Sequence, residues 1–288
     1  DSIPGMNFSA VADINHYHTD LDNIHNISER TIGHYGEQLI PIMKEYLTND
    51  AYSDRTSLMA EKDAIFFSLP VLGMFCFSKS TYLLLNIGVI LLFFHLLSME
   101  KNLRWKPILK QSGILIGASL VLVFIGEIIA WLCALSVGAR FKWFGTIQGI
   151  PFDNAVMILS VFVLAIGLIR YYRHRVNILQ KLYASMITLI IGSIFFYLIA
   201  HRENMMFFIP LCIGTITLFL WKNTSSRIFP LLGMAILLIH AFSFVYIVAM
   251  ALSIGALGLV LLVAFYNLII VIPLAHEYLT DTTSNQIP

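Results

Sequence analysis

The sequence has little charge and few cysteines for its length. Only 12% of its 288 residues are Asp, Glu, Lys or Arg, whereas 58% are hydrophobic and the mean hydropathy is +0.79. A hydrophobic content this high, gathered in long apolar runs, is not typical of a soluble globular protein. The composition therefore indicates a membrane protein. The three cysteines lie far apart in apolar surroundings, and their spacing predicts neither a disulfide framework nor a metal knuckle. They are Cys76, Cys133 and Cys212.

Two further features are missing. The chain starts at Asp1 with neither an initiator methionine nor a signal peptide. We therefore expect a fragment of a longer protein, which enters in the middle of a domain just before a strand. No basic stretch with interleaved aromatic residues is present, so the sequence gives nucleic-acid binding no support.

Charge divides the chain into two parts. Residues 1–63 contain eleven Asp and Glu against four Lys and Arg, whereas residues 64–288 contain six against fourteen. This pattern predicts an acidic aqueous head followed by a membrane region with basic loops. Within the head, Ser28 is a suitable N-cap for a helix that reaches about Leu47. Its apolar residues recur at three- and four-residue spacing and form one stripe that needs a packing partner.

Apolar runs fill the rest of the chain. The run at 64–75 contains Pro70 and Gly73 and is too short to span a bilayer, which takes about 20 residues. We expect it to form strands or a broken helix at the membrane interface. Seven spanning helices should follow, with the last two separated near Ser253. Their expected ranges are 81–98, 113–135, 154–169, 182–200, 205–221, 228–248 and 252–274.

The loops between these helices indicate an orientation. If the first helix starts outside the cytoplasm, the inside loops hold ten Lys and Arg and the outside positions hold four. Cytoplasmic loops are enriched in Lys and Arg, so this is the favoured direction. It places the acidic head outside the cytoplasm, in a periplasm or lumen, and the tail from His276 inside.

A polar, His-rich turn lies in the head, at residues 16–22. His16, His18 and Asp22 fall within seven positions. Imidazole and carboxylate groups are the ligands from which zinc sites are built. A solvated surface turn has the same composition, so the residues alone leave both interpretations open.

Three segments of the first 50 residues carry a resemblance to a known family. They are Pro4-Gly5-Met6-Asn7-Phe8, Tyr17-His18-Thr19 with Asp22, and Gly36-Glu37. Together they resemble the C-terminal end of a catalytic domain of the M28 family of zinc aminopeptidases. The resemblance implies that His18 is the last ligand of a two-zinc centre, that Tyr17 stabilises the tetrahedral intermediate and that Asp22 holds the turn. The family's other ligands and its general base come earlier in its chain and have no counterpart here.

The apolar run at 64–75 resembles the stretch after the catalytic domain in polytopic M28 proteases of the endoplasmic reticulum and vacuole. Ser68 stands where that family has Asp, and Pro70 is an extra residue. With this resemblance the expected fold is a mainly α, polytopic helical membrane protein, preceded by the strand–turn–helix remnant of an α/β peptidase domain. The expected parts are 1–52 (peptidase domain), 53–80 (linker and interfacial segment), 81–275 (seven-helix transmembrane domain) and 276–288 (cytoplasmic tail).

The resemblance also implies an activity. The full-length parent would be a zinc metalloexopeptidase, in which two zinc ions activate a water and polarise the peptide carbonyl near a free N-terminus. Its partners would be the lipid bilayer, a peptide substrate and the upstream remainder of the peptidase domain. One ligand does not make a zinc site, so we expect the fragment alone to be inactive.

Two ionisable residues inside the expected helices support an alternative function. Glu127 is the only acid in the middle of a spanning helix, and His240 falls at a similar depth. The sequence therefore allows a hydrogen bond between Glu127 and His240, and Asn267 and Tyr246 are further polar candidates for such a site. Intramembrane ionisable residues by default indicate function, which favours a transporter-like or scaffold protein. A transport path usually has several polar positions and broken helices, so we favour a protonated Glu127 that fixes helix packing.

Overall fold

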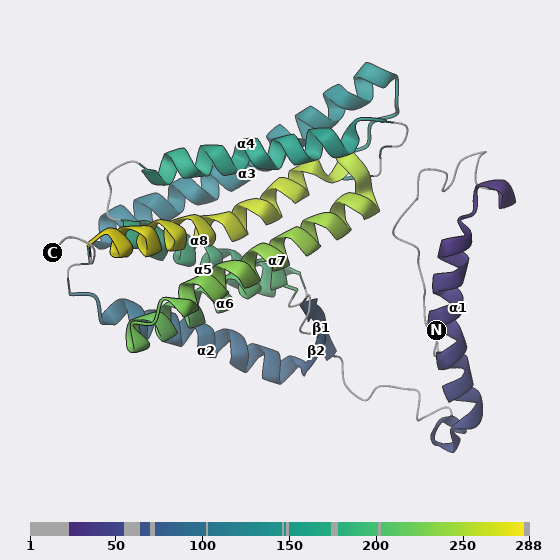
Figure 1. Ribbon diagram of the computed structural model, residues 1–288, viewed down its shortest axis with the longest axis horizontal. Helices are drawn as coiled ribbons and strands as arrows, with labels where there is room; N and C mark the ends of the chain where they lie inside the picture. The colour runs from purple at the N-terminus through teal and green to yellow at the C-terminus, as the bar shows by residue number, and fades with distance from the viewer. Residues whose placement is uncertain are drawn as a thin grey trace. The chain divides into compact units, whose positions relative to one another are not determined.

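A computed structural model divides the chain into two compact units, which are described separately (Figure 1). The first comprises Asp1–Ala64 and the second Ile65–Pro288. The described residues are 23–54, 64–69, 73–101, 103–145, 147, 150–173, 178–200 and 203–284. The elements before residue 64 are η2 (Ile24–Asn26), α1 (Glu29–Thr48) and η3 (Asp50–Tyr52). The others are β1 (Ala64–Leu69), β2 (Gly73–Ser78), α2 (Lys79–Ser98), α3 (Trp105–Val137), α4 (Asp153–Arg173), α5 (Ile178–Ile199), α6 (Met205–Thr224), α7 (Ile228–Leu252), η5 (Ser253–Ala256) and α8 (Leu257–Ser284).

Helix α1 confirms the predicted capping of the head. The Ser28 hydroxyl accepts a hydrogen bond from the backbone N–H of Thr31 at 3.4 Å, which satisfies one of the unpaired donors of the first turn. Pro41 lies inside the helix, and none of the helix residues is buried. The apolar stripe is therefore only partly covered: Ile32 is 58% and Met43 57% accessible, and Tyr35, Leu39 and Ile42 are half-buried.

Strands β1 and β2 form a two-stranded sheet, so the strand form of the expected interfacial segment is confirmed. The rings of Phe67, Phe75 and Phe77 stack on one face, with centroids 5.8 to 6.4 Å apart. Phe67 and Phe77 also pack against the core of the second unit. The other face exposes Phe66 and Met74. This hairpin belongs structurally with the helices that follow it.

Seven described helices are long and apolar enough to cross a membrane, as the sequence predicted. The observed helices are longer than the predicted spans. Helix α3 has 33 residues, or about 50 Å, against a hydrocarbon core of about 30 Å. It stops at Gly138, whose left-handed conformation (φ 70°) brings the N–H of Ala139 to the carbonyl of Ala134 at 2.9 Å. Helix α8 likewise continues ten residues beyond the predicted end at Leu274.

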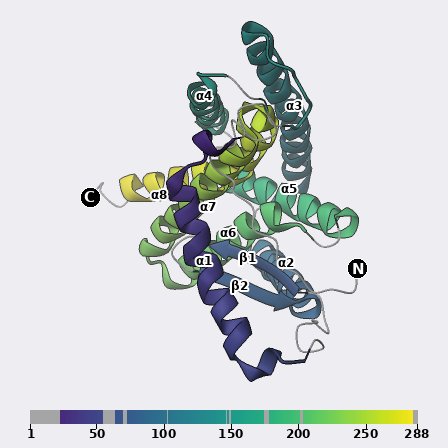
Figure 2. The same ribbon diagram turned by 90° about the vertical axis from the view of Figure 1, so that its right-hand side faces the viewer.

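The long apolar run at the end of the chain is split at Ser253, as expected. Ser253 has φ 52° and ψ −152°, values that end α7, and the short helix η5 follows before α8 begins. Helix α8 then runs through the centre of the bundle and packs against α3, α4, α5, α6 and α7 (Figures 1 and 2). Most of its span is buried, whereas only 17% of the span of α4 and of α7 is buried.

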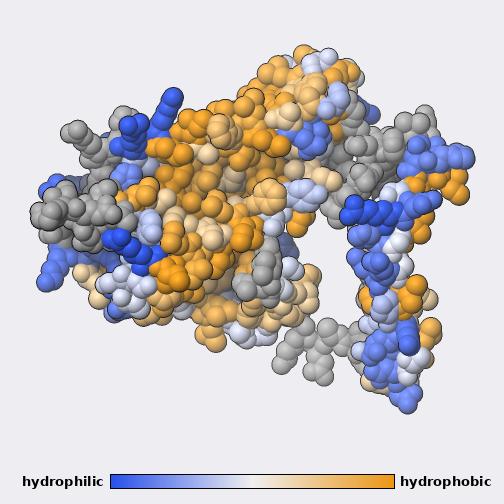
Figure 3. All heavy atoms as spheres, viewed as in Figure 1, coloured by the Kyte–Doolittle hydropathy of each residue, from blue (hydrophilic) through white to orange (hydrophobic). Residues whose placement is uncertain are grey.

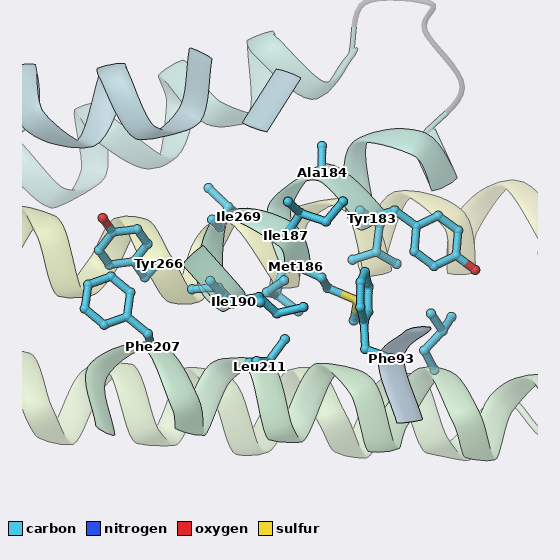
Figure 4. Close-up of a cluster of buried hydrophobic side chains, with 14 of the residues drawn as sticks. Phe93, Tyr183, Ala184, Met186, Ile187, Ile190, Phe207, Leu211, Tyr266 and Ile269 are labelled. Carbon is cyan, nitrogen blue, oxygen red and sulfur yellow. The ribbon is translucent and has the colours of Figure 1, made fainter. Parts of the chain in front are cut away.

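The main core lies between α5, α6, α8 and α2 (Figure 4). Phe93, Tyr183, Met186 and Leu211 are buried there, together with Ile269 of the central helix. A space-filling view shows a broad apolar band across the middle of the helical unit on the face that carries α4, α7 and α8, with hydrophilic residues gathered at the left-hand end, where α2 and α8 finish (Figure 3). The pattern suits a bundle whose middle faces hydrocarbon and whose ends face water.

The sequence predicts close helix contacts at several glycines, among them Gly192 and Gly214, and a helix-packing seam at Gly113 and Gly117 from their four-residue spacing. The structure confirms some of these contacts and not others. A Cβ atom at Gly192 would lie 2.3 Å from the ring of Phe207, and one at Gly214 would lie 3.0 Å from Ile270, so these contacts are confirmed. The predicted packing seam at 113 and 117 is wrong, because a Cβ at either glycine has no described heavy atom within 4 Å. Small residues at four-residue spacing permit close packing but do not require it.

Candidate functional site

The predicted zinc-binding turn lies outside the described residues. Tyr17, His18, His16 and Asp22 all fall within residues 1–22. In the part of the chain that the structure describes, no group of three or more His, Cys, Asp or Glu side chains is placed to hold a metal ion. The zinc site therefore stays a prediction.

Glu127 is the most deeply buried acid among the described residues. Its side chain has no exposed surface, and its Oε2 atom accepts a hydrogen bond from the backbone N–H of Phe144 at 3.1 Å. Its Oε1 atom makes no hydrogen bond with a described residue. A buried acceptor without a partner costs about 1–3 kcal/mol, so the surroundings of this oxygen matter.

The start of α8 provides those surroundings. A Cβ atom at Gly258 would lie 3.0 Å from Oε1 of Glu127, and the backbone N–H of Gly258 is near the same carboxyl group. Gly258 is in the first turn of α8, where N–H groups have no partner within the helix and the helix dipole favours negative charge. The carboxyl group of Glu127 thus lies against the N-terminus of a neighbouring helix.

Two glycines make this approach close. A Cβ atom at Gly126 would lie 2.5 Å from the Cα atom of Gly258, and one at Gly258 would lie 2.7 Å from the carbonyl oxygen of Val123. Real Cβ atoms do not tolerate such distances to backbone, so α3 and α8 can cross here only because both positions lack a side chain. The contact has no signal in the sequence beyond two separate glycines.

The loop between α3 and α4 is tied to the same region. The Ser253 hydroxyl donates to the carbonyl of Ile147 at 2.7 Å and accepts from the N–H of Ile147 at 3.3 Å. Gly255 packs directly on the backbone of Gly145. Glu127, Ser253 and Gly255 therefore hold one loop against the junction of α7 and α8.

Glu127 and His240 do not meet. Glu127 lies beside α8 at Gly258, whereas His240 forms a 3.2 Å contact from Nδ1 to Oδ1 of Asn267, nine residues farther along the same helix. Nine helical residues span about 14 Å, so the Glu127–His240 pair that the sequence left open does not form. Because α3 runs from Trp105 to Val137, Glu127 is also six residues past the midpoint of its helix and ten residues from its end.

His240 and Asn267 form a buried polar pair at the middle of α7. His240 is twelve residues from each end of α7, and Asn267 is fully buried. The amide nitrogen of Asn267 donates to the carbonyl of Val263 at 2.9 Å, which leaves its Oδ1 to accept from the imidazole. Tyr246 is 56% exposed and takes no part.

A buried polar cluster that the sequence did not predict lies at the end of α2 away from its basic loop. The amide of Asn204 accepts from the hydroxyl of Tyr82 at 2.5 Å and donates to Asn86 at 2.8 Å and to Ser193 at 2.6 Å. All four residues are at most 6% exposed. The cluster joins α2, α5 and the start of α6. The available signal was the four-residue spacing of two polar residues within an apolar helix.

A second missed cluster lies at the other end of the same helices. Glu100 forms an ion pair with Lys222, and the hydroxyl of Tyr183 donates to Glu100 at 2.9 Å. Lys222 also donates to the hydroxyl of Tyr183 at 3.0 Å. Side chains from α5, α6 and the segment after α2 meet here, although 122 positions separate Glu100 and Lys222 in the sequence. No local pattern could have paired them.

These contacts define a class but not an activity. The described polar groups join helices and hold one loop, and the seven apolar helices are those of a multi-pass helical membrane protein. Comparisons with protein-family models, with curated proteins and with solved structures find no match to this chain.

Proposed function

We propose that this chain is the C-terminal part of a membrane-anchored zinc metallopeptidase of the M28 type. The observation that carries the proposal is the order of its parts. The Tyr17-His18-Thr19 turn is followed by the capped helix α1, by a short hairpin and by seven apolar helices. This order is the one that the resemblance to polytopic M28 proteases implies.

In the full-length parent, His18 would hold zinc through an imidazole nitrogen. The hydroxyl of Tyr17 would donate a hydrogen bond to the oxygen that becomes negative as water attacks the peptide carbonyl. Bound zinc would supply a Lewis acid and an activated water. The remaining ligands and the general base would come from the upstream remainder of the domain, and the substrate would be a peptide with a free N-terminus.

The alternative of a transporter that uses Glu127 and His240 has less support. The two residues have separate partners, and Glu127 faces a backbone N–H and a helix N-terminus. Those surroundings suit a group that fixes packing. We therefore assign Glu127 a structural part in the membrane domain, whose helices anchor the peptidase head.

Substitution of the turn residues in the full-length parent tests the proposal. We expect His18→Ala to lower zinc content and eliminate most aminopeptidase activity, because it removes a ligand. Tyr17→Phe should keep zinc near normal while turnover falls by roughly 100-fold, the effect of losing one oxyanion donor. His16→Ala should be milder. The measurement is bound metal beside kcat for each purified variant.

His25→Ala is the matched control, because His25 is an exposed histidine of the same head. It should keep both zinc and activity. If the His16→Ala variant lost zinc and the His18→Ala variant kept it, the assignment of the zinc ligand to His18 would be wrong. An upstream sequence without a His-x-Asp motif, a Glu-Glu pair and a later Asp would remove the peptidase assignment altogether.

A further inference from the structure

A dense group of cations lies where α2 ends and α3 begins. Lys101, Arg104, Lys106 and Lys110 fall within ten residues, and all four side chains are exposed. None of the four has an ion pair or hydrogen bond with another residue of the described chain. We call these four residues the basic patch.

The acid nearest to the basic patch in the sequence is already engaged. Glu100 precedes Lys101 directly, but its carboxylate is paired with Lys222 and accepts from Tyr183. The first turn of α3 contains no acidic residue, and the side chain of Arg104 makes no capping bond. Among the described residues, no acidic side chain pairs with the basic patch, which therefore presents four positive charges.

The helix geometry aims this charge away from the protein. Ile108, Ser112 and Leu115 form the buried face of α3 in its first three turns. At 100° per residue, Lys106 and Lys110 share a face roughly opposite to that buried face. The two lysines therefore point toward the surroundings of the bundle, at the level where its apolar band ends.

An apolar stripe runs beside the lysines. Trp105 and Leu109 are also four residues apart, and they are 50% and 55% exposed. Trp is enriched at the level of lipid headgroups, where its ring is partly wet and partly apolar. Lysine stems can lie along apolar surface while their ammonium groups reach the headgroups. An amphipathic surface of this kind fits a lipid boundary.

We propose that the basic patch binds the phosphate groups of anionic phospholipids in the adjacent leaflet. Lys106 and Lys110 contact the headgroup phosphates, Lys101 and Arg104 extend the positive surface, and Trp105 lies at the edge of the acyl chains. Clusters of four or more cations beside a membrane helix attract anionic lipids through several summed charges. The partner is a lipid surface, since the stripe beside the charges is apolar.

Lipid titration of the full-length protein in detergent tests this proposal, with bound lipid counted by native mass spectrometry. Phosphatidylglycerol should bind more tightly than phosphatidylcholine. Lys106→Gln with Lys110→Gln should weaken phosphatidylglycerol binding on the order of tenfold and leave phosphatidylcholine unchanged. The Arg replacements at both positions should restore binding, since only charge is required.

The matched control is Arg140→Gln with Lys142→Gln, two exposed cations at the far end of α3. This variant should bind phosphatidylglycerol as the unaltered protein does. Equal weakening by both double variants, or no preference for the anionic lipid, would overturn the proposal. Full displacement of phosphatidylglycerol by the same concentration of inorganic phosphate would also overturn it, because the site would then recognise a free anion.

Discussion

At the scale of single residues, the buried polar groups of the membrane domain work as links between helices. Asn204 has three side-chain partners on two other helices, and Glu127 joins α3 to a loop and to the start of α8. A buried polar group must find a partner when no water is available, so each link fixes where its helices meet. The one oxygen of Glu127 without a hydrogen bond is compensated by the helix N-terminus that it faces.

Glu127 substitutions test this account. Glu127→Gln keeps an oxygen that can accept from Phe144, so we expect a loss of at most about 1 kcal/mol in unfolding free energy and unchanged peptidase activity in the parent. Glu127→Leu leaves the N–H of Phe144 without a partner and should cost about 1–3 kcal/mol. Chemical unfolding in lipid bicelles measures both.

Glu203→Gln serves as the control, because Glu203 is exposed. The unfolding free energy of this variant should be within about 0.5 kcal/mol of that of the unaltered protein. A Glu127→Gln protein that folds normally but loses activity would show that the carboxyl group has a functional part and not a structural one.

Residue roles were the least predictable part of the molecule. The burial of Glu127 followed from its position in an apolar run, and the polar nature of His240 and Asn267 was visible in the sequence. Their partners were not, because a hydrogen bond depends on the level at which two helices cross. Glu127 lies six residues past the midpoint of α3, at the level of Gly258, whereas His240 lies at the middle of α7.

At the scale of elements, apolar run length predicted the seven helices and the break at Ser253. The ends of the helices were harder to predict from the sequence, because α3 and α8 continue past the apolar core through charged or polar residues. Such residues are soluble at the membrane boundary, so hydropathy marks the membrane and not the end of the helix. The seam predicted at Gly113 and Gly117 was wrong, and the close contact of α3 is made by Gly126 with Gly258 of α8.

A pair of alanine substitutions distinguishes the glycines on α3. Gly126→Ala places a Cβ atom 2.5 Å from the backbone of Gly258, so α3 and α8 must separate, and we expect a loss of about 1–3 kcal/mol. Gly117→Ala meets open space and should be neutral or stabilise the helix by about 0.5–1 kcal/mol. Thermal or chemical unfolding of the two variants gives the comparison.

The opposite order of stability would contradict the observed crossing. It would instead support the seam at Gly113 and Gly117 that the sequence alone suggested. Loss of stability in both variants would mean that α3 packs on a further surface through its exposed face.

At the scale of the whole molecule, an odd number of crossings has a direct consequence. If the seven candidate spans among the described residues all cross, the segment before α2 and the end of α8 lie on opposite sides of the membrane. The count of ten Lys and Arg against four predicts which side is which and places the head that carries His18 outside the cytoplasm. The peptidase proposal requires this arrangement for a periplasmic or lumenal active site.

Cysteine labelling of the full-length protein in sealed, oriented membranes tests that central claim most directly. Cys76 is exposed on β2 and is a native reporter just before α2, and a Ser226→Cys variant reports the loop between α6 and α7. With Cys133 and Cys212 replaced by alanine, an impermeant maleimide should label Cys76 from outside. In a Ser226→Cys variant whose Cys76 is also replaced by alanine, it should react only after the membrane is opened. The reverse pattern, or labelling of both positions from the same side, would contradict the orientation and the catalytic head outside the cytoplasm.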